Sequence, residues 1–319
     1  MSERVSILQA AAALREADKI LIMTHHYPDG DTLGSGVALC RALHKLGKTA
    51  RVECSDPIPE KYDYIFANLQ ETAWFEPEFI CAVDIADTRL LGEKLSVYAD
   101  GVSLCIDHHG SNTLYAQKLL LIPEYAATTM IITEVIRALD VEIDREIATA
   151  VYTGIATDTG CFKYSNTTSY TLRMAADMLD YGVDSEMINR TMFDIKSRAR
   201  IELERLALDN MRFYLGDRCA IMCIMTDMIE KSGADEDDME GLAPLPRQIE
   251  GVWVGVTMRE KRDGTFKVSV RTGSHADASA ICVLLGGGGH VQAAGCMIDG
   301  PVDKAIETML GAVGKVIGE

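Results

Sequence analysis

The sequence lacks the features that would place the protein outside the cell or in a membrane. Its nine cysteines include no CxxC pair, and their odd number argues against a disulfide framework and for a reducing cytoplasm. No apolar run reaches the ~20 residues that span a bilayer. The N-terminal stretch carries acidic residues within its apolar segment and has no signal-peptide cleavage pattern. We therefore expect a cytoplasmic protein that makes no contact with a membrane.

Positive charge is also scarce. The chain has 31 Lys and Arg against 48 Asp and Glu, which gives a net charge of −17. Proteins that neutralise many phosphates along a long nucleic acid normally carry a basic stripe, and the sequence shows none. Any nucleic-acid substrate should therefore be short, or be held through metal ions, and binding of long duplex nucleic acid is not expected.

What is present favours an α/β protein of two domains. The 319 residues suffice for two domains of the usual ~150 residues. Short strand-like runs alternate with helical segments in the first half, which predicts a parallel sheet; these runs are 19–24, 49–54, 79–84 and 102–107. A more helical region, a polar stretch at 184–210 and a second set of strand-like runs follow, with a hairpin turn at 262–265.

The strand-like run 19–24 ends in a loop that carries His25, Asp29 and Asp31. Ligands of parallel sheets bind at the carboxyl ends of the strands, and an imidazole with two carboxylates on one tight loop suits a divalent cation. A polar turn with an aspartate as helix N-cap explains the same residues about equally well.

Two further strand-like runs also end in acidic residues. Asp84 ends the run 79–84, whereas Asp87 is better explained as a helix cap. Asp107 ends the run 102–107 and precedes His108 and His109. Because adjacent side chains point in different directions, one imidazole can bind metal while the other faces the substrate. Four of the seven histidines fall in two doublets, each at the end of a predicted strand.

Asp158 adds a further carboxylate, at the end of a predicted helix and before a loop rich in Thr and Asn. A parallel sheet would bring these clusters to one edge. So many like charges could share a crevice only if cations neutralised them. Two divalent ions ~3.5–4 Å apart would do so, and such pairs catalyse in-line attack on phosphorus.

These motifs resemble a known family. HHYPDGD, VDIADT, DHH with the following Gly-Ser-Asn, and TDTGCFKYSNTT resemble, in this order, the motifs of the DHH phosphoesterase superfamily. The segment VSVRTGS…GGGGHVQAAG resembles the DHH-associated C-terminal domain. Within the superfamily the chain is similar to the bacterial nanoRNase/pAp phosphatase family, whose members hydrolyse short oligoribonucleotides and remove a phosphate from 3′-phosphoadenosine 5′-phosphate (pAp).

The resemblance implies a fold and two Mn²⁺ ions. The implied fold is a parallel-sheet DHH domain over residues 1–185, a helical connector over 186–212 and a smaller α/β DHH-associated domain over 213–319, with the active site in the interdomain cleft. His25 and Asp29 would hold one Mn²⁺, and Asp31, His108 and Asp158 the other. Asp84 would bridge the two ions.

The resemblance also implies roles outside the metal ligands. Asp107 would fix the tautomer of an imidazole, and His109 would contact the scissile phosphate. In the second domain, Arg271, the glycines Gly286, Gly287, Gly288 and Gly289, and His290 would bind the part of the substrate away from the cleaved bond. Glycine lets backbone N–H groups approach a phosphate closely, and Arg271 offers a bidentate fork. His26 matches no ligand position, and Cys161 is read as a packed small residue.

The expected function is therefore Mn²⁺-dependent hydrolysis of phosphoesters in short oligonucleotides, pApA or pAp. Two alternatives stay open: a cyclic-dinucleotide phosphodiesterase, and a nucleotide-binding regulator without catalysis on the same fold. Family II inorganic pyrophosphatase shares the N-terminal motifs, but its basic C-terminal substrate motif is absent. The sequence leaves the oligomeric state open, a homodimer included.

Overall fold

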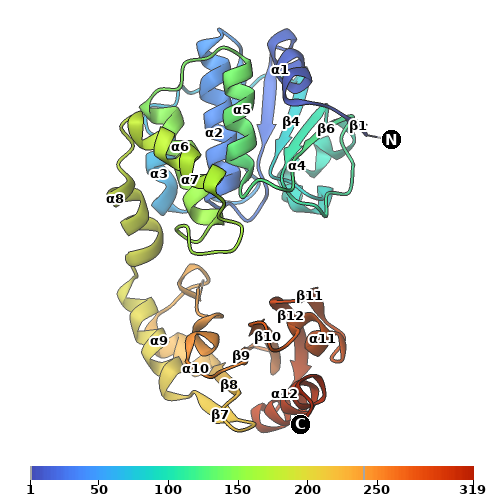
Figure 1. Ribbon diagram of the computed structural model, residues 1–319, viewed down its shortest axis with the longest axis vertical. Helices are drawn as coiled ribbons and strands as arrows, with labels where there is room; N and C mark the ends of the chain where they lie inside the picture. Colours follow the sequence, from blue (N-terminus) through green and yellow to red (C-terminus); the bar gives the residue numbers. More distant parts are fainter. Residues whose placement is uncertain (1, 240) are drawn as a thin grey trace. The chain divides into compact units, whose positions relative to one another are not determined.

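The computed structural model describes residues 2–239 and 241–319, apart from the side chain of Asp237, and divides them into two compact units (Figure 1). One unit ends at Ile195 and the other begins at Lys196. Each has its own six-stranded sheet and its own hydrophobic core. The domain limits at 185 and 213, and the role of 186–212 as a connector, stay predictions. Among the described residues, no helix is long and apolar enough to cross a bilayer.

The sheet of the first unit is parallel throughout, as the sequence predicts. Its strand order is β1-β6-β5-β4-β2-β3. The strands are β1 (Glu3–Arg4), β2 (Ile20–Met23), β3 (Ala50–Glu53), β4 (Phe79–Val83), β5 (Leu104–Asp107) and β6 (Lys118–Leu121). The four strand-like runs of the sequence correspond to β2, β3, β4 and β5, whereas β1 and β6 were not predicted.

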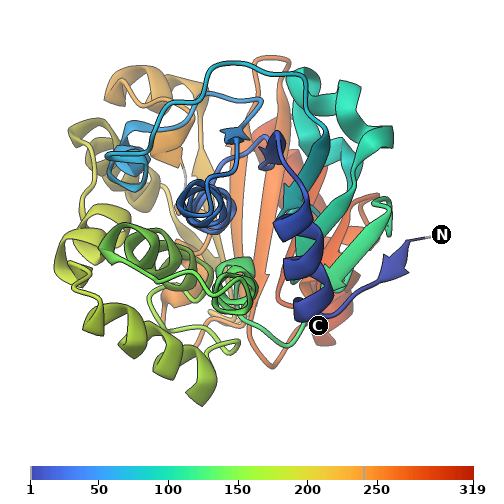
Figure 2. The same cartoon turned by 90° about the horizontal axis from the view of Figure 1, so that it is seen from above.

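Helices cover both faces of this sheet, which explains why its strands are buried and apolar. The larger core lies between the sheet and α1, α2, α5 and α6, and a smaller core lies under α4 (Figures 1 and 2). The helices are α1 (Ile7–Glu16), α2 (Gly30–Lys45), α3 (Asp63–Phe66), α4 (Gly92–Leu95), α5 (Thr128–Ala138), α6 (Arg145–Asp158), α7 (Ser169–Asp180) and α8 (Ser185–Asn189).

Helices α2 and α6 approach each other unusually closely because glycines lie at their contact. A Cβ added to Gly34 would lie 2.4 Å from the carbonyl oxygen of Ala150, and one added to Gly154 would lie 2.7 Å from Asp31 Oδ1. The close approach brings Asp31, in the first turn of α2, near Asp158, the last residue of α6.

The strand order also fixes where a ligand can bind. From β2 the chain passes to β3 on one side and then to β4 on the other. The carboxyl ends of β2 and β4 therefore flank the point at which the strand order reverses, which is where open α/β sheets bind ligands. The loop 24–29, which leads into α2, follows β2, and Asp84 follows β4.

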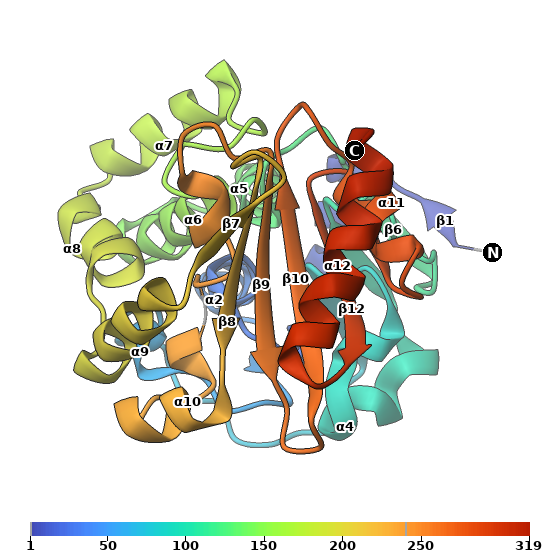
Figure 3. The same cartoon turned by 90° about the horizontal axis from the view of Figure 1, so that it is seen from below.

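The second unit has a mixed sheet in the order β11-β12-β10-β9-β8-β7, in which only β8 and β9 run parallel. Its core lies between one face of the sheet and α11 and α12 (Figure 3). The predicted hairpin turn is confirmed, since Gly264 has a φ of +81° and the N–H of Lys261 donates to the carbonyl of Thr265 at 2.8 Å. The elements are α9 (Arg198–Asp209), β7 (Arg212–Tyr214), β8 (Cys219–Ile224), α10 (Thr226–Ser232), β9 (Val254–Glu260), β10 (Thr265–Thr272), α11 (Ala278–Val283), β11 (Gly288–His290), β12 (Ala293–Asp299) and α12 (Val302–Ile317).

Candidate active site

The loop after β2 places His25 beside Asp29. Asp29 is the N-cap of α2: its Oδ1 accepts hydrogen bonds from the N–H groups of Asp31 and Thr32, each at 3.0 Å. Its Oδ2 lies 3.5 Å from His25 Nε2. The two readings of this residue from the sequence, helix cap and cation ligand, are thus compatible, because each uses a different carboxylate oxygen.

Asp84 lies between two groups of polar side chains. Its side chain is 3% exposed, with Oδ2 3.5 Å from His25 Nε2 and Oδ1 3.7 Å from His108 Nε2. Its φ is +60°, a region that non-glycine residues rarely occupy and that costs on the order of 1–3 kcal/mol. The hydrogen bond from its N–H to the carbonyl of Ile106, at 2.9 Å, helps to hold this conformation.

The second group consists of Asp31, His108 and Asp158. His108 Nε2 lies 3.3 Å from Asp158 Oδ2 and 3.9 Å from Asp31 Oδ2. On the other side of the ring, His108 Nδ1 lies 3.1 Å from the carbonyl of Tyr125. Since a carbonyl can only accept, Nδ1 carries a proton, and Nε2 is the ring nitrogen directed toward the three carboxylates.

His109 differs from His108 in its surroundings. Its Nδ1 lies 2.8 Å from Asp107 Oδ1, and its backbone N–H donates to the same oxygen at 3.1 Å. Asp107 is buried, and its Oδ2 accepts from Asn112 Nδ2 at 2.7 Å. The His109 side chain is 45% exposed, against 13% for His108. Asp107 thus fixes the orientation of His109 through Nδ1, and no described residue hydrogen-bonds to its Nε2.

Burial and crowding shift the pKa of several of these groups. Burial, together with the carboxylates of Asp31 and Asp84, raises the pKa of Asp158 to about 10. Burial and the neighbouring carboxylates of Asp84 and Asp29 also hold the pKa of Asp31 well above its usual range. These carboxyls can therefore ionise together only when cations offset their charge.

The pKa values of two imidazoles are raised as well, but here the nearby carboxylates favour the charged form of the ring. Burial acts to lower the pKa of His25, but its contacts with Asp29 and Asp84 outweigh burial and raise the pKa to about 10. The hydrogen bond to Asp107 raises the pKa of His109 to about 9 against the effect of burial. The pKa of Asp107 itself falls below its ordinary value, because its hydrogen bonds from His109 and Asn112 outweigh burial.

The donor atoms fit a pair of divalent cations. Two groups of three, His25 with Asp29 and Asp84, and Asp31 with His108 and Asp158, each place one ligand atom per residue within 4.8 Å of the others. Among the described residues, His108 Nε2 is a buried nitrogen without a hydrogen-bond partner, which a bound cation would satisfy. The donors are oxygens and imidazole nitrogens without thiolate, a set that suits Mn²⁺ and Mg²⁺ better than structural zinc. A third group, Asp84 with His108 and His109, also places one ligand atom per residue within 4.8 Å of the others.

Two threonines hold the carboxylates and were not predicted from the sequence. The N–H groups of Thr128 and Thr129, at the start of α5, donate to the two oxygens of Asp31 at 2.6 Å and 2.9 Å. The hydroxyl of Thr128 donates to Asp84 Oδ1 at 2.9 Å. A helix N-terminus favours negative charge, and the Thr-Thr pair at the start of a helical segment was the only signal in the sequence.

Residues assigned structural roles lie outside these groups. His26 contacts Asp56, with Nδ1 and Oδ2 3.5 Å apart, and its ring packs at a tilt of 43° against that of Tyr27. Asp87 caps the short helix Thr88–Leu91, as predicted, by accepting from the N–H of Arg89. Cys161 is half-buried, and burial raises the pKa of its thiol, which does not favour a thiolate nucleophile.

The predicted substrate-binding residues of the second unit lie along three adjacent strands. Arg271 on β10 is opposite Ala293 on β12, which in turn is opposite His290 on β11. The amides of Gly286 and Gly287 donate to the carbonyls of Val283 and Cys282 and so end α11. Gly288 and Gly289 belong to β11, which pairs with β12, and Gly289 has a φ of +146°. The binding of phosphate by the four glycines stays a prediction.

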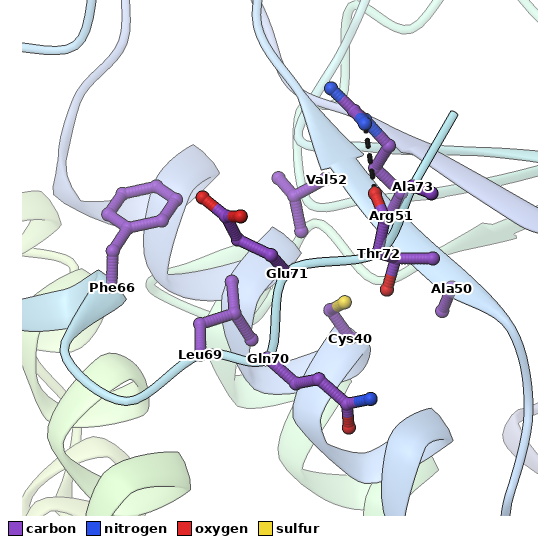
Figure 4. A pocket seen from close by; sticks show the side chains of 10 residues that line it. All are labelled: Cys40, Ala50, Arg51, Val52, Phe66, Leu69, Gln70, Glu71, Thr72 and Ala73. Atoms are coloured by element: carbon purple, nitrogen blue, oxygen red, sulfur yellow. Dashed lines mark hydrogen bonds between the residues drawn. The ribbon is translucent and has the colours of Figure 1, made fainter.

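A separate cavity of about 710 Å³ lies beside the edge strand β3 (Figure 4). It is lined in part by Phe66, Leu69 and Glu71, and Arg51 at its border donates to the carbonyl of Thr72 at 2.9 Å. None of the predicted site residues lines it, so its size does not make it the candidate active site.

Comparison with known proteins identifies both units. Residues 19–155 match the model of the DHH family, N-terminal domain, and residues 217–319 match that of the DHHA1 domain. The chain is 37% identical over 304 residues to the bifunctional oligoribonuclease and PAP phosphatase NrnA of Thermus thermophilus. The aligned region covers 92% of this chain and 89% of that protein.

Solved structures agree on the fold. An exopolyphosphatase-related protein from Bacteroides fragilis superposes with a TM-score of 0.86 at 24% identity, over 97% of this chain and 96% of that one. RecJ of Thermus thermophilus in complex with Mn²⁺ superposes with a TM-score of 0.56 at 14% identity, over 97% of this chain and 54% of that one. The chain therefore belongs to the DHH superfamily of phosphoesterases and, within it, to the family of bifunctional oligoribonucleases and PAP phosphatases.

Proposed function

We propose that the protein hydrolyses phosphoester bonds in short oligonucleotides and in pAp, with two Mn²⁺ ions bound at the carboxyl edge of the first sheet. The observation that carries this proposal is the position of Asp84, whose two carboxylate oxygens face two separate groups of ligand atoms. The kinship with NrnA of Thermus thermophilus, a bifunctional oligoribonuclease and PAP phosphatase by name, supports the choice of substrates.

In this proposal the protein residues divide into ligands and groups that act on the substrate. His25 and Asp29 would hold one ion and Asp31, His108 and Asp158 the other, and Asp84 would be a ligand shared by both groups. Bound ions would neutralise the carboxylates and stabilise the negative charge that develops on the oxygens of the reacting phosphate.

His109 acts on the scissile phosphate. Asp107 keeps the proton on Nδ1 of His109 and favours the imidazolium, which can then donate from Nε2 to a phosphate oxygen. The high pKa of His109 supports this role, since the ring is charged at neutral pH in the arrangement seen here.

The second unit supplies contacts to the rest of the nucleotide. We assign to Arg271, Gly288, Gly289 and His290 the binding of a phosphate other than the one that is hydrolysed. A guanidinium presents two parallel donors to phosphate oxygens, and the glycines leave the backbone accessible to a bulky anion.

A substrate panel tests the proposal. Purified protein with Mn²⁺ should release AMP from pApA and phosphate from pAp, and should act weakly or not at all on pyrophosphate and cyclic di-AMP. A clear preference for the cyclic dinucleotide would favour the alternative of a cyclic-dinucleotide phosphodiesterase. Nucleotide binding without turnover at any metal concentration would favour a non-catalytic regulator.

A further inference from the structure

One face of the second sheet carries several Arg and Lys side chains, which is unusual in a chain of net charge −17. Val254, Val256 and Met258 of β9 point into the core with α11 and α12, so the residues between them point to the opposite face. We call this opposite face the polar face. It is formed by Gly255, Thr257 and Arg259 of β9, Lys267, Ser269 and Arg271 of β10, and Ala293, Gly295 and Met297 of β12.

Arg247, which the sequence did not single out, lies against this face. It belongs to the short helical turn Leu245–Gln248. A Cβ added to Gly255 would lie 2.4 Å from the backbone nitrogen of Arg247, and one added to Gly273 would lie 2.2 Å from its Nη2. Two glycines thus leave the room that the arginine occupies, one for its backbone and one for its guanidinium.

The guanidinium of Arg247 has no hydrogen bond through its Nε within the described part of the chain. Its Nε is buried and donates to no acceptor, and no carboxylate among the described residues forms a salt bridge with it. Arg259, on the same face, pairs with Glu236. A partly buried cation without a counter-charge is unfavourable unless an anion completes the site.

The register of the strands places Arg247 next to Arg271. Arg271 is directly opposite Gly255, over which the turn of Arg247 packs. Gly273, which touches the guanidinium of Arg247, follows Arg271 by two residues, or ~7 Å along an extended chain. In the described part of the chain Arg271 also lacks a carboxylate partner, and its Nη1 donates only to the carbonyl of Val270.

We propose that Arg247 and Arg271 together bind one dianionic phosphomonoester, the terminal phosphate of the nucleotide substrate, and so select phosphorylated ends. This inference rests on the proposed function. A terminal phosphate carries about −1.5 to −2 charges at pH 7 and three acceptor oxygens, whereas an internal phosphodiester carries a single charge. Two guanidinium groups side by side therefore favour the monoester.

The test compares pApA, which has a 5′-phosphate, with ApA, which lacks one. Arg247→Gln should lower the ratio of kcat/KM for pApA to that for ApA by about 10- to 100-fold, the range for loss of a charged hydrogen bond. Arg200→Gln is the matched control. Arg200 lies in the same unit, on α9, its Nε also lacks a partner, and its guanidinium also packs against a glycine, Gly241. Because it is not beside Arg271 in the sheet register, its loss should change the ratio less than twofold.

Two further variants test the same site in case Arg247→Gln does not fold. Gly273→Ala keeps Arg247 and its charge, but its new Cβ would displace the guanidinium, so the ratio should fall by about 3- to 10-fold. Arg247→Lys keeps the charge without the fork and should give a value between those of the wild type and Arg247→Gln. Thermal unfolding of each variant confirms that it is folded.

Binding without catalysis separates this inference from the proposed function. In EDTA, the full-length protein should bind pApA more tightly than ApA, and Arg247→Gln should weaken pApA binding at least tenfold. If the wild type shows this binding pattern but hydrolyses neither dinucleotide with Mn²⁺, the proposed function fails and the phosphate site stands. If the wild type hydrolyses both dinucleotides and Arg247→Gln behaves like Arg200→Gln, the inference is wrong and the proposed function stands.

Discussion

Asp107 Oδ1 lies 2.8 Å from His109 Nδ1, and this contact separates the two histidines of the doublet. His108 instead places Nδ1 on the carbonyl of Tyr125 and leaves Nε2 among three carboxylates. The two rings therefore have different surroundings although they are adjacent in sequence. This difference is the basis for our proposal that His108 binds a cation and His109 contacts the substrate.

His109→Ala should retain both metal ions but lose ~10²–10³ in kcat, because it removes a donor that acts on charge developing in the transition state. Asp107→Asn should also lower kcat, since the His109 ring loses the carboxylate that orients it. Elemental analysis and kinetics on both variants provide the check. Loss of metal from His109→Ala equal to that from a ligand variant would mean that the roles in the doublet are assigned wrongly.

Asp84→Ala should lose both metal ions, because one carboxylate serves both groups of ligands. Asp87→Ala is a suitable control, since Asp87 lies three residues away and only caps a short helix. The control should keep two ions per chain and lose at most ~1 kcal/mol of stability, as expected for a cap. An Asp84→Ala protein that still bound two ions would contradict the bridging role.

The metal-free protein should become less stable as the pH rises from 7 to 9. The pKa of His25 is raised from 6.5 to about 10 and that of Asp158 from 3.8 to about 10. In this window the folded state therefore binds more protons than the unfolded state, and each extra proton costs about 1.4 kcal/mol of stability per pH unit. Thermal unfolding in EDTA at several pH values measures the slope.

Two controls belong to this pH experiment. Asp158→Asn removes one of the titrating groups and should make the slope shallower. Protein loaded with Mn²⁺ should also show a smaller decline, because cations replace the protons. A melting temperature that rose with pH in EDTA would contradict the assignment of raised pKa values.

Gly154→Ala should destabilise the first unit and weaken metal binding. The new Cβ would lie 2.4 Å from Thr129 Cγ2 and 2.7 Å from Asp31 Oδ1, so α2 and α6 would have to separate, at a cost of about 1–3 kcal/mol for overpacking. Gly311→Ala in α12, where a Cβ meets nothing within 4 Å, should instead be neutral or stabilising. Unfolding curves of the two variants, with metal titrations, make the comparison, and equal stability would argue against the close helix contact.

The kcat/KM should be high for RNAs of two to five nucleotides and much lower for RNAs longer than about ten nucleotides. The few cations on the polar face can neutralise only a few phosphates, and further phosphates meet a chain of net charge −17. Kinetics on a series of 5′-phosphorylated RNAs measures the decline. Equal efficiency on a 24-nucleotide RNA and on pApA would overturn this expectation.

The sequence predicted much of this architecture because its signals are local. Apolar runs that end in Asp84 or Asp107 predict both a strand and the position of a carboxylate at the strand's end. The hairpin at 262–265 and the cap at Asp87 were predictable for the same reason, since turn and cap chemistry depends on neighbouring residues.

Other features depend on contacts between distant segments, and the sequence alone could not predict them. Thr128 binds Asp84 across 44 positions of the chain, and the N–H of Thr129 reaches Asp31 across 98. Arg247 is an unremarkable residue in the sequence, and its place beside Arg271 follows only from the register of β9 and β10 and from the room left at Gly255. Short strands such as β1 carry too few residues for a periodic pattern.

The most direct test of the account is the hydrolysis of pApA and pAp by protein stripped of metal with EDTA, before and after titration with Mn²⁺, Mg²⁺ and Zn²⁺. We expect no turnover without metal, and a recovery of activity that is greatest with Mn²⁺ and saturates at two ions per chain. Full activity in the metal-stripped protein would contradict it.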